Sequence, residues 1–380
     1  MKNNNRIQII VSCKDYIRDY ECVKSMGTIK HKLPMINAYV VEINENKMNE
    51  IISNDGVLAY EYDAYITAQM NRASEIIELK WAHDRDIYGE NIGVAVVDTG
   101  IWPHEDFISD KNRVVGFCDI INNEKKPYDD NGHGTHVAGI IGGNGSASNK
   151  VYMGIAPKCN LIGVKVLNSK GDGNISDVLA GLQWIIDNKK KYNIRIVNIS
   201  VGATTKSEQD ESSMLVKGVN AVWDAGLVVV VAAGNNGPNP MSISIPGISR
   251  KVITVGSSDD NYTVEVFGSK KKDYSGRGPT SACIKKPDII APGSSIVSCQ
   301  VHKRKSYKTK NRNTSPMYTI KSGTSMSTPI VSGAIALLLS RHPKLTNRDV
   351  KLKLKTSTID LGHSWSKQGW GLINIPKLLS

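Results

Sequence analysis

The chain has 380 residues, 40% of them hydrophobic and 22% charged, and a formal net charge of +12, which suits one large globular domain and one small one. It has no run of 18 apolar residues, and its first apolar run, residues 7–12, is too short for a secretion signal. This excludes a membrane-spanning helix, and we expect a cytoplasmic protein.

Residues 1–70 predict a small module of their own. Three segments rich in β-branched or alternating apolar residues predict strands, at 6–13, 35–43 and 57–65. Two further segments, 14–26 and 45–53, predict short helices. The expected order is β-α-β-α-β, a two-layer α+β module of the ferredoxin-like type. Residues 71–90 are expected to form a linker with a lead-in helix around 73–83.

Continuous apolar strands alternate with helices through residues 91–380. The predicted strands are 92–97, 161–166, 194–199, 227–232 and 252–255, and the predicted helices are 134–143, 175–191, 209–225 and 327–341. Unbroken β-branched strands separated by helices indicate a parallel sheet that is covered on both faces. The sequence therefore predicts a three-layer α/β/α domain with a mostly parallel central sheet.

Asp98 directly follows the first of these central strands. In a sheet of this kind, catalytic groups gather where strands end and loops begin. Asp98-Thr99-Gly100 also occurs as a motif in aspartic proteases, but those enzymes need two facing copies and this chain contains one. Taken alone, the motif is ambiguous.

His133 lies in the motif Asn131–Gly139, at the expected first turn of a helix and between two glycines. This position suits an exposed general base. One alternative is a plain loop entering a helix. The other is a metal site that includes His136, although no glutamate or third histidine stands at zinc-site spacing.

Ser325 lies in the motif Ser322–Pro329, at the expected start of a long apolar helix. Backbone N–H groups and the helix dipole favour developing negative charge there. The motif is not the Gly-x-Ser-x-Gly elbow of α/β-hydrolases, because position 327 is serine. For this motif alone, a helix-capping serine is an equally good interpretation.

The chain order Asp98, His133, Ser325 is the order found in subtilisin. On these motifs the chain resembles the subtilase family (peptidase S8) over about residues 85–378. Further segments match the family in register: 154–157, 161–167, 197–202, 232–237, 274–279 and 287–293. Residues 127–133 and 161–168 are most similar to the AprX-type cytoplasmic enzymes of the family.

The resemblance implies a serine endopeptidase that works through an acyl-enzyme intermediate. Ser325 would be the nucleophile, His133 the base and then the acid, and Asp98 the group that orients the imidazole. The oxyanion hole would combine the side-chain amide of Asn235 with the backbone N–H of Ser325. Two alternatives remain. A non-catalytic binding module would be marked by the loss of a triad residue, and none is lost here. A hydrolase of other esters or amides would not need the strand-pairing edges of the cleft.

The resemblance also implies a cleft in which an extended peptide pairs with two strands. The substrate-binding residues would be Gly171, Asp172, Gly173, Ile175, Ser200, Val201, Gly202, Ala233 and Gly234. Asp172 would favour a basic substrate residue near the scissile bond. A carboxylate that only keeps the edge strand soluble is an equal alternative.

Residues 1–70 resemble the inhibitory propeptide of the family. The resemblance implies a zymogen whose prosegment acts as an intramolecular inhibitor and is removed by self-cleavage within about residues 66–75. Polypeptide substrates and this prosegment are the expected partners, without a membrane and without nucleic acid.

Catalysis of this type needs no cofactor, and the identity of any metal site stays unknown. The segment Gly142–Lys150 lacks the usual sequence motif of the family's strong calcium-binding loop, so the sequence does not decide whether a structural calcium is bound. Asp129 and Asp130 are candidates for a different calcium site. The six cysteines show no zinc spacing, and we expect free buried thiols. The basic run 303–312 is expected to be a solvated loop near the cleft rim.

Overall fold

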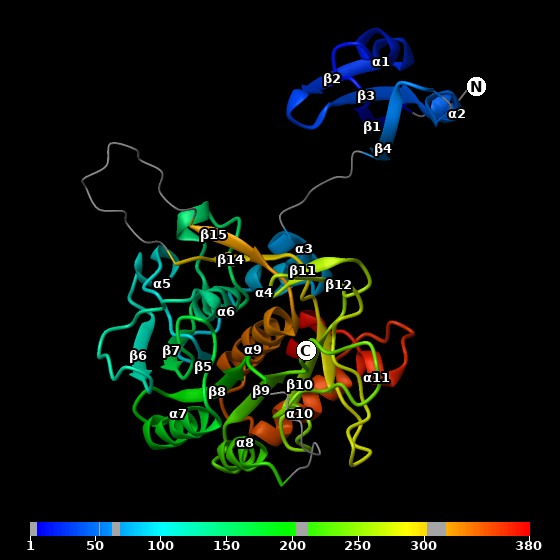
Figure 1. Ribbon diagram of the computed structural model, residues 1–380. Helices are drawn as coiled ribbons and strands as arrows, with labels where there is room; N and C mark the ends of the chain where they lie inside the picture. Colours follow the sequence, from blue (N-terminus) through cyan, green and yellow to red (C-terminus); the bar gives the residue numbers. More distant parts are fainter. Residues whose placement is uncertain (1–5, 53, 63–68, 203–211, 302–316) are drawn as a thin grey trace. The chain divides into compact units, whose positions relative to one another are not determined.

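The computed structural model describes the chain except for residues 1–5, 53, 63–68, 203–211 and 302–316 (Figure 1). The basic run 303–312 therefore lies outside the described residues. The chain divides into two compact units, Met1–Thr67 and Ala68–Ser380. Among the described residues, no helix combines the length and the apolar composition needed to cross a membrane.

The first unit is a four-stranded antiparallel sheet with two short helices. In chain order its elements are β1 (Arg6–Cys13), α1 (Tyr20–Met26), β2 (Thr28–Leu33), β3 (Ala38–Asn44), α2 (Met48–Ile52) and β4 (Val57–Tyr62). The strands lie in the order β2-β3-β1-β4, and the element order β-α-β-β-α-β is typical of ferredoxin-like modules. The expected order β-α-β-α-β was wrong because it omitted β2. This edge strand, Thr-Ile-Lys-His-Lys-Leu, is mostly exposed and carries a weak apolar signal.

A seven-stranded parallel sheet forms the centre of the second unit, in the order β13-β10-β9-β8-β5-β7-β6. Its strands are β5 (Gly93–Asp98), β6 (Val114–Asp119), β7 (Asn160–Lys165), β8 (Ile194–Ile199), β9 (Val228–Ala232), β10 (Ile253–Ser257) and β13 (Ile289–Ala291). All five strands predicted for this domain are present, within two residues at each end. The sequence interpretation missed β6 and β13, which are the two edges.

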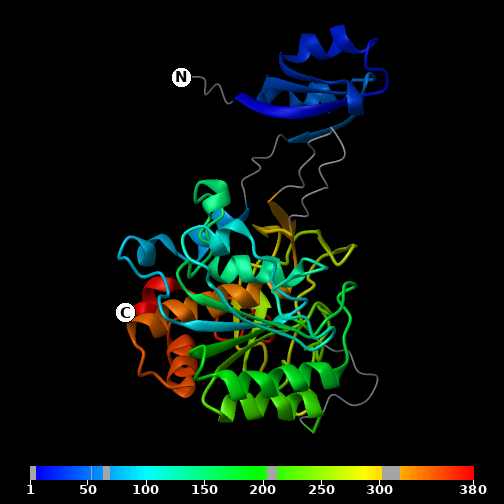
Figure 2. The same ribbon diagram turned by 90° about the vertical axis from the view of Figure 1, so that its left-hand side faces the viewer.

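Helices cover both faces of this sheet. The helices α6 (His133–Gly142) and α9 (Thr324–Arg341) pack on one face, and α7 (Ile175–Asn188) and α8 (Met214–Asp224) pack on the other. Figure 2 shows the green helices α7 and α8 below the sheet and the orange helix α9 above it. This confirms the predicted three-layer α/β/α fold. Helix α9 is buried around almost its whole circumference, as expected for a helix without a polar face.

Residues 71–90 belong to the second unit. They contain the end of α3 (Gln69–Ile76) and all of α4 (Lys80–His83), and Ile77 is completely buried. The Ile77 carbonyl accepts a hydrogen bond from the backbone of Ile375, which begins the C-terminal helix α12 (Ile375–Leu379). His83 Nε2 bonds the Ile155 carbonyl at 3.0 Å. The segment expected as a linker is thus largely a packed part of the domain.

The remaining elements are short and lie around the sheet. They are the helices α5 (Glu105–Ile108), α10 (Asn347–Thr356) and α11 (Trp365–Gln368), and the hairpins β11 (Val264–Val266) with β12 (Ser269–Lys271) and β14 (Ile296–Cys299) with β15 (Tyr318–Lys321). Both hairpins contribute residues to the cleft described below.

Candidate active site

Asp98 and His133 are hydrogen-bonded at the carboxyl end of the central strand β5. Asp98 is completely buried, and its Oδ1 accepts a hydrogen bond from the Thr99 N–H at 2.8 Å. His133 is the first residue of α6, and its Nδ1 lies 2.8 Å from Asp98 Oδ1 and 2.9 Å from Oδ2. Because an ionised carboxylate only accepts, Nδ1 carries the proton and Nε2 carries the lone pair. Nε2 is buried and has no hydrogen-bond partner among the described residues.

The loop before His133 is fixed by the buried carboxylate of Asp129. Its Oδ1 accepts hydrogen bonds from the Thr99 hydroxyl at 2.9 Å and the Gly132 N–H at 2.8 Å, and its Oδ2 accepts from the Thr135 hydroxyl at 2.6 Å. A Cβ at Gly134 would overlap the Gly100 carbonyl, so only glycine lets α6 approach the end of β5 this closely. The sequence thereby holds the imidazole against Asp98.

Lys165 stabilises the same region from the end of β7. Its side chain is fully buried, and Nζ donates to Asp130 Oδ1 at 2.7 Å and to the carbonyls of Thr99 and Leu167, both at 2.8 Å. Asp129 and Asp130, which we considered for a calcium site, therefore both have protein hydrogen-bond partners. A lysine inside an otherwise apolar strand was the sequence signal for this contact, because buried lysines are almost always paired.

Ser325 lies in the first turn of α9, and its hydroxyl points to Ser200. Its Oγ donates to the Ser200 carbonyl at 2.9 Å, while Ser200 Oγ donates to the Ser325 carbonyl at 3.1 Å. The hydroxyl is thus not bonded to His133. Catalytic hydrogen bonds are often absent or long in a free enzyme and form in the substrate complex.

The side chain of Asn235 is oriented by Thr324. Asn235 Oδ1 accepts hydrogen bonds from the Thr324 N–H at 2.9 Å and the Thr324 hydroxyl at 3.1 Å. This directs the amide nitrogen Nδ2 toward Gly323, where an added Cβ would lie 3.2 Å from it. The neighbouring Ser325 N–H is in the first helical turn, where backbone donors have no intrahelical acceptor. Both donors therefore lie at the N-terminal end of α9.

A cleft of about 650 Å³ contains these groups. Of the predicted substrate residues, Gly171, Asp172, Gly173, Ile175, Ser200, Val201, Gly202 and Gly234 line it. Ala233 does not. It is fully buried behind the cleft, where its N–H bonds Val255 and its carbonyl accepts from the Ser244 N–H, so its assignment as a cleft residue was wrong.

The electrostatic balance of the cleft is positive. Among the described lining residues, the carboxylate of Asp172 is outnumbered by the lysines at 170, 271 and 321. Sequence reasoning did not anticipate Lys271 or Lys321 here, because both come from hairpins that carry no recognisable motif.

His136, which we had considered as a metal partner of His133, has a different environment. Its Nε2 contacts the carbonyls of Ile296 and Thr319 at 3.1 and 3.2 Å. Complete burial lowers the pKa of His136 to about 3, with a further contribution from the positive charge of Lys321. His136 is therefore a neutral histidine that ties α6 to the hairpin β14–β15.

Together, the buried aspartate at a strand end, the histidine bonded to it, and the serine beside two oriented donors define a serine hydrolase with an α/β/α fold. Residues 89–371 match the model of the peptidase S8 family, described as the subtilase family. The chain belongs to this family of subtilisin-like serine proteases.

Similar proteins agree with this assignment. The chain is 39% identical over 340 residues to serine protease AprX of Bacillus subtilis (strain 168), covering 87% of this chain and 76% of that protein. It is 33% identical to a thermostable alkaline protease of Halalkalibacterium halodurans, covering 90% and 82%. The solved structure of a cold adapted subtilisin-like serine proteinase matches with a TM-score of 0.58 and 29% identity, covering 76% of this chain and 89% of that one.

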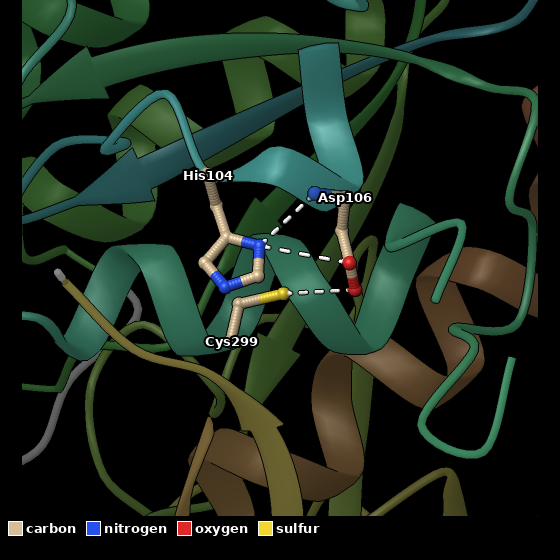
Figure 3. A group of neighbouring side chains, drawn as sticks. All are labelled: His104, Asp106 and Cys299. Atoms are coloured by element: carbon tan, nitrogen blue, oxygen red, sulfur yellow. Dashed lines mark hydrogen bonds and ion pairs between the residues drawn. The ribbon is translucent and has the colours of Figure 1, made fainter. Parts of the chain in front are cut away.

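Structural calcium is common in this family, and one group of possible metal ligands is present among the described residues. Figure 3 shows its members, His104 and Asp106 at α5 and Cys299 at the end of β14. Asp106 accepts hydrogen bonds from the Tyr318 hydroxyl at 2.9 Å, the Ala147 N–H at 3.0 Å and the Cys299 thiol at 3.5 Å. Burial raises the pKa of Cys299 well above its usual range. A carboxylate surrounded by proton donors, beside a protonated thiol, does not fit calcium.

All six cysteines are free, as predicted. Cys13, Cys159 and Cys299 are buried, but Cys22 and Cys118 are only half-buried and Cys283 is exposed. The expectation that every thiol would be buried was therefore wrong.

Proposed function

We propose that this protein is a serine endopeptidase whose catalytic residues are Asp98, His133 and Ser325. The observation that carries the proposal is the buried bond between His133 Nδ1 and Asp98, which leaves an unpartnered Nε2 as the base. Asp98 fixes this tautomer and stabilises the imidazolium that forms during the reaction. Membership in a protease family supports the peptide bond as the substrate.

The reaction begins when Ser325 Oγ leaves the Ser200 carbonyl and turns to His133 Nε2. Nε2 accepts the hydroxyl proton as Oγ attacks the scissile carbonyl carbon. The imidazolium then donates this proton to the departing amine, and an acyl-enzyme remains. A water molecule, deprotonated by the same nitrogen, hydrolyses the ester and restores Ser325.

Asn235 Nδ2 and the Ser325 N–H would bind the oxyanion of the tetrahedral intermediates. Thr324 holds the amide before substrate arrives, so no reorganisation is needed as the negative charge develops. The start of α9 adds the partial positive charge of a helix N-terminus.

An extended polypeptide would pair with the edges Gly171–Gly173 and Ser200–Gly202, which both line the cleft. The three lysines that line the same cleft would repel a basic substrate residue, so they oppose the preference for basic residues that Asp172 would produce. A profile over a peptide library, compared between wild type and Asp172→Ala, tests what this carboxylate contributes.

The unit Met1–Thr67 would serve as the inhibitory prosegment of a zymogen. It has its own core, formed by residues such as Ile9, Val11, Val41 and Ile51, as a separately folding module requires. We expect self-cleavage within about residues 66–75, of which 66–68 lie outside the described residues. The presence of six free thiols supports a reducing, cytoplasmic compartment.

The decisive experiment compares Ser325→Ala with Ser327→Ala. Ser327 lies two residues further along the same helix, and its buried hydroxyl has no hydrogen-bond partner among the described residues, so it is a matched control. We expect Ser325→Ala to lose hydrolysis of a quenched fluorescent peptide and covalent labelling by a serine-directed phosphonate. Ser327→Ala keeps both. Retention of labelling in Ser325→Ala would identify another nucleophile.

The same variants test self-processing. Mass spectrometry of wild type should show a fragment that begins within about residues 66–75, and Ser325→Ala should remain full length. A fragment of equal size in Ser325→Ala would show that another protease makes the cut.

A further inference from the structure

The hairpin β11–β12 carries an exposed aromatic residue in an unfavourable backbone conformation. Its turn consists of Phe267 and Gly268, with φ angles of +48° and +74°. Two-residue turns with both φ angles positive favour asparagine or glycine at the first position, and a bulky residue is an outlier there. Phe267 is also 72% exposed. Strain of this kind is concentrated at functional sites.

The Phe267 side chain lies over the proposed catalytic base. Its ring centroid is 6.0 Å from that of His133, and the two ring planes are inclined by 29°. Phe267 also lines the catalytic cleft. An exposed ring beside this imidazole is placed to contact whatever is bound next to the scissile bond.

The base of the hairpin is firmly anchored. Val264 and Val266 pack against the buried ring of Tyr274 in a small separate core. Lys271 Nζ donates a hydrogen bond to the Asn235 carbonyl at 3.2 Å. The hairpin therefore reaches from the residue that would bind the oxyanion to the residue that would act as base, and it holds the Phe267 ring at a defined place.

The position of this ring in the cleft indicates which half of a substrate it meets. The acyl half of the substrate, which precedes the scissile bond, would pair with the strand edges Gly171–Gly173 and Ser200–Gly202. The scissile carbonyl would then lie beside Asn235. Phe267 belongs to none of these, and it covers the imidazole that must protonate the leaving amine. The residue that departs with that amine is therefore the one that the ring contacts.

We propose that Phe267 is a specificity-determining residue that binds the substrate residue immediately after the scissile bond and favours a large apolar side chain there. The proposal rests on the function proposed above, because it takes His133 and Ser325 as base and nucleophile. Contact between two aromatic side chains typically improves binding by about three- to tenfold. The ring gains a partner only when the subsite is filled, which explains its exposure in the free protein.

Partitioning of the acyl-enzyme tests this subsite directly. A peptide ester acylates Ser325, and the acyl group then passes either to water or to an added amino acid amide that binds where the leaving amine was. The ratio of aminolysis to hydrolysis is measured with phenylalaninamide and with glycinamide. We expect wild type to prefer phenylalaninamide and Phe267→Ala to lose about three- to tenfold of that preference.

Two further variants separate the explanations. Phe267→Gly removes the ring but suits the positive φ, so it should lose the same preference without strain in the turn. Met241→Ala is a matched control, since Met241 is 56% exposed, has a φ of +59° and does not line the cleft. It should keep the wild-type preference.

An unchanged preference in Phe267→Ala would overturn the proposal. An equal fall in rate with both amides would also overturn it, because that result would show that the ring only positions His133. Failure of the proposed function is distinct, since it would appear as ester cleavage that survives in Ser325→Ala.

Discussion

Replacing Asp98 with asparagine removes one charge from one end of the proposed triad while it keeps the size of the side chain. Thr99 N–H donates to Oδ1, so the amide nitrogen of Asp98→Asn takes the place of Oδ2, 2.9 Å from His133 Nδ1. Its N–H groups then face Nδ1, which forces the imidazole proton onto Nε2. Nε2 can no longer accept the proton of Ser325.

The expected loss has two sources. Opposite unit charges about 4 Å apart interact by about 4 kcal/mol at an effective dielectric constant of 20, which corresponds to roughly 1,000-fold in rate. The wrong tautomer brings the loss in kcat to about 10,000-fold in the chymotrypsin triad. We therefore expect kcat to fall between about 1,000- and 10,000-fold, with a smaller change in KM.

The assay is hydrolysis of a quenched fluorescent peptide, with folding checked by thermal unfolding. Asp119→Asn is the matched control. Asp119 accepts hydrogen bonds from the backbone of Ile121 and Asn122 at 2.9 and 3.0 Å and does not contact His133, so its loss affects stability rather than kcat. A folded Asp98→Asn protein with kcat within tenfold of wild type would refute the reasoning.

Three further predictions concern the surroundings of the site. Gly323→Ala places a Cβ 3.2 Å from Asn235 Nδ2 at a φ of +141°, and we expect kcat to fall at least tenfold in the peptide assay with little change in KM. Lys165→Met leaves two buried carbonyls and Asp130 without their donor, and urea unfolding should show a loss of roughly 2–4 kcal/mol; an unchanged midpoint would contradict the role given to this lysine. His136 is neutral when folded, with a pKa of about 3, whereas the unfolded chain takes up its proton as pH falls below about 6.5, so stability is lost from pH 6.5 toward pH 3. Between pH 7 and pH 5 this group lowers the free energy of unfolding by about 2 kcal/mol. Adding His136→Gln to Ser325→Ala should make the measured decrease in the free energy of unfolding smaller by that amount.

The central strands could be predicted because their sequence is determined by burial on both faces. The strand Ile194–Ile199 was predicted at both ends correctly, since four of its six residues are β-branched and apolar and only Arg195 and Asn198 interrupt them. The edge strand β6 was missed. It is buried only in part, and its Gly116, Cys118 and Asp119 interrupt the apolar run.

The proximity of Asp98 and His133 could be predicted because strand ends and helix starts meet at one edge of a parallel sheet. The orientation of single side chains could not. Ala232 and Gly234 line the cleft while Ala233 points away from it, because side chains alternate along an extended backbone. A match to a sequence motif does not tell which of its residues face the cleft.

Contacts made by segments without a recognisable motif could not be predicted from the sequence either. The distance from Phe267 to His133 depends on how one hairpin packs, and nothing in Phe-Gly predicts a partner 134 positions earlier in the chain. The bond between Ser325 Oγ and Ser200 depends on a side-chain rotamer, which tertiary packing decides.

In the proposed mechanism, that bond would hold the nucleophilic hydroxyl of Ser325 away from His133 in the free protein. The Ser200 carbonyl that holds Ser325 belongs to the same edge that would receive the backbone N–H of a bound peptide. A peptide whose N–H took this acceptor would then free the proposed nucleophile as its own carbonyl arrived. A small reagent without a backbone N–H would meet the Ser325 hydroxyl still bonded to Ser200, so we expect its acylation rate to understate the reactivity of the protein toward polypeptides.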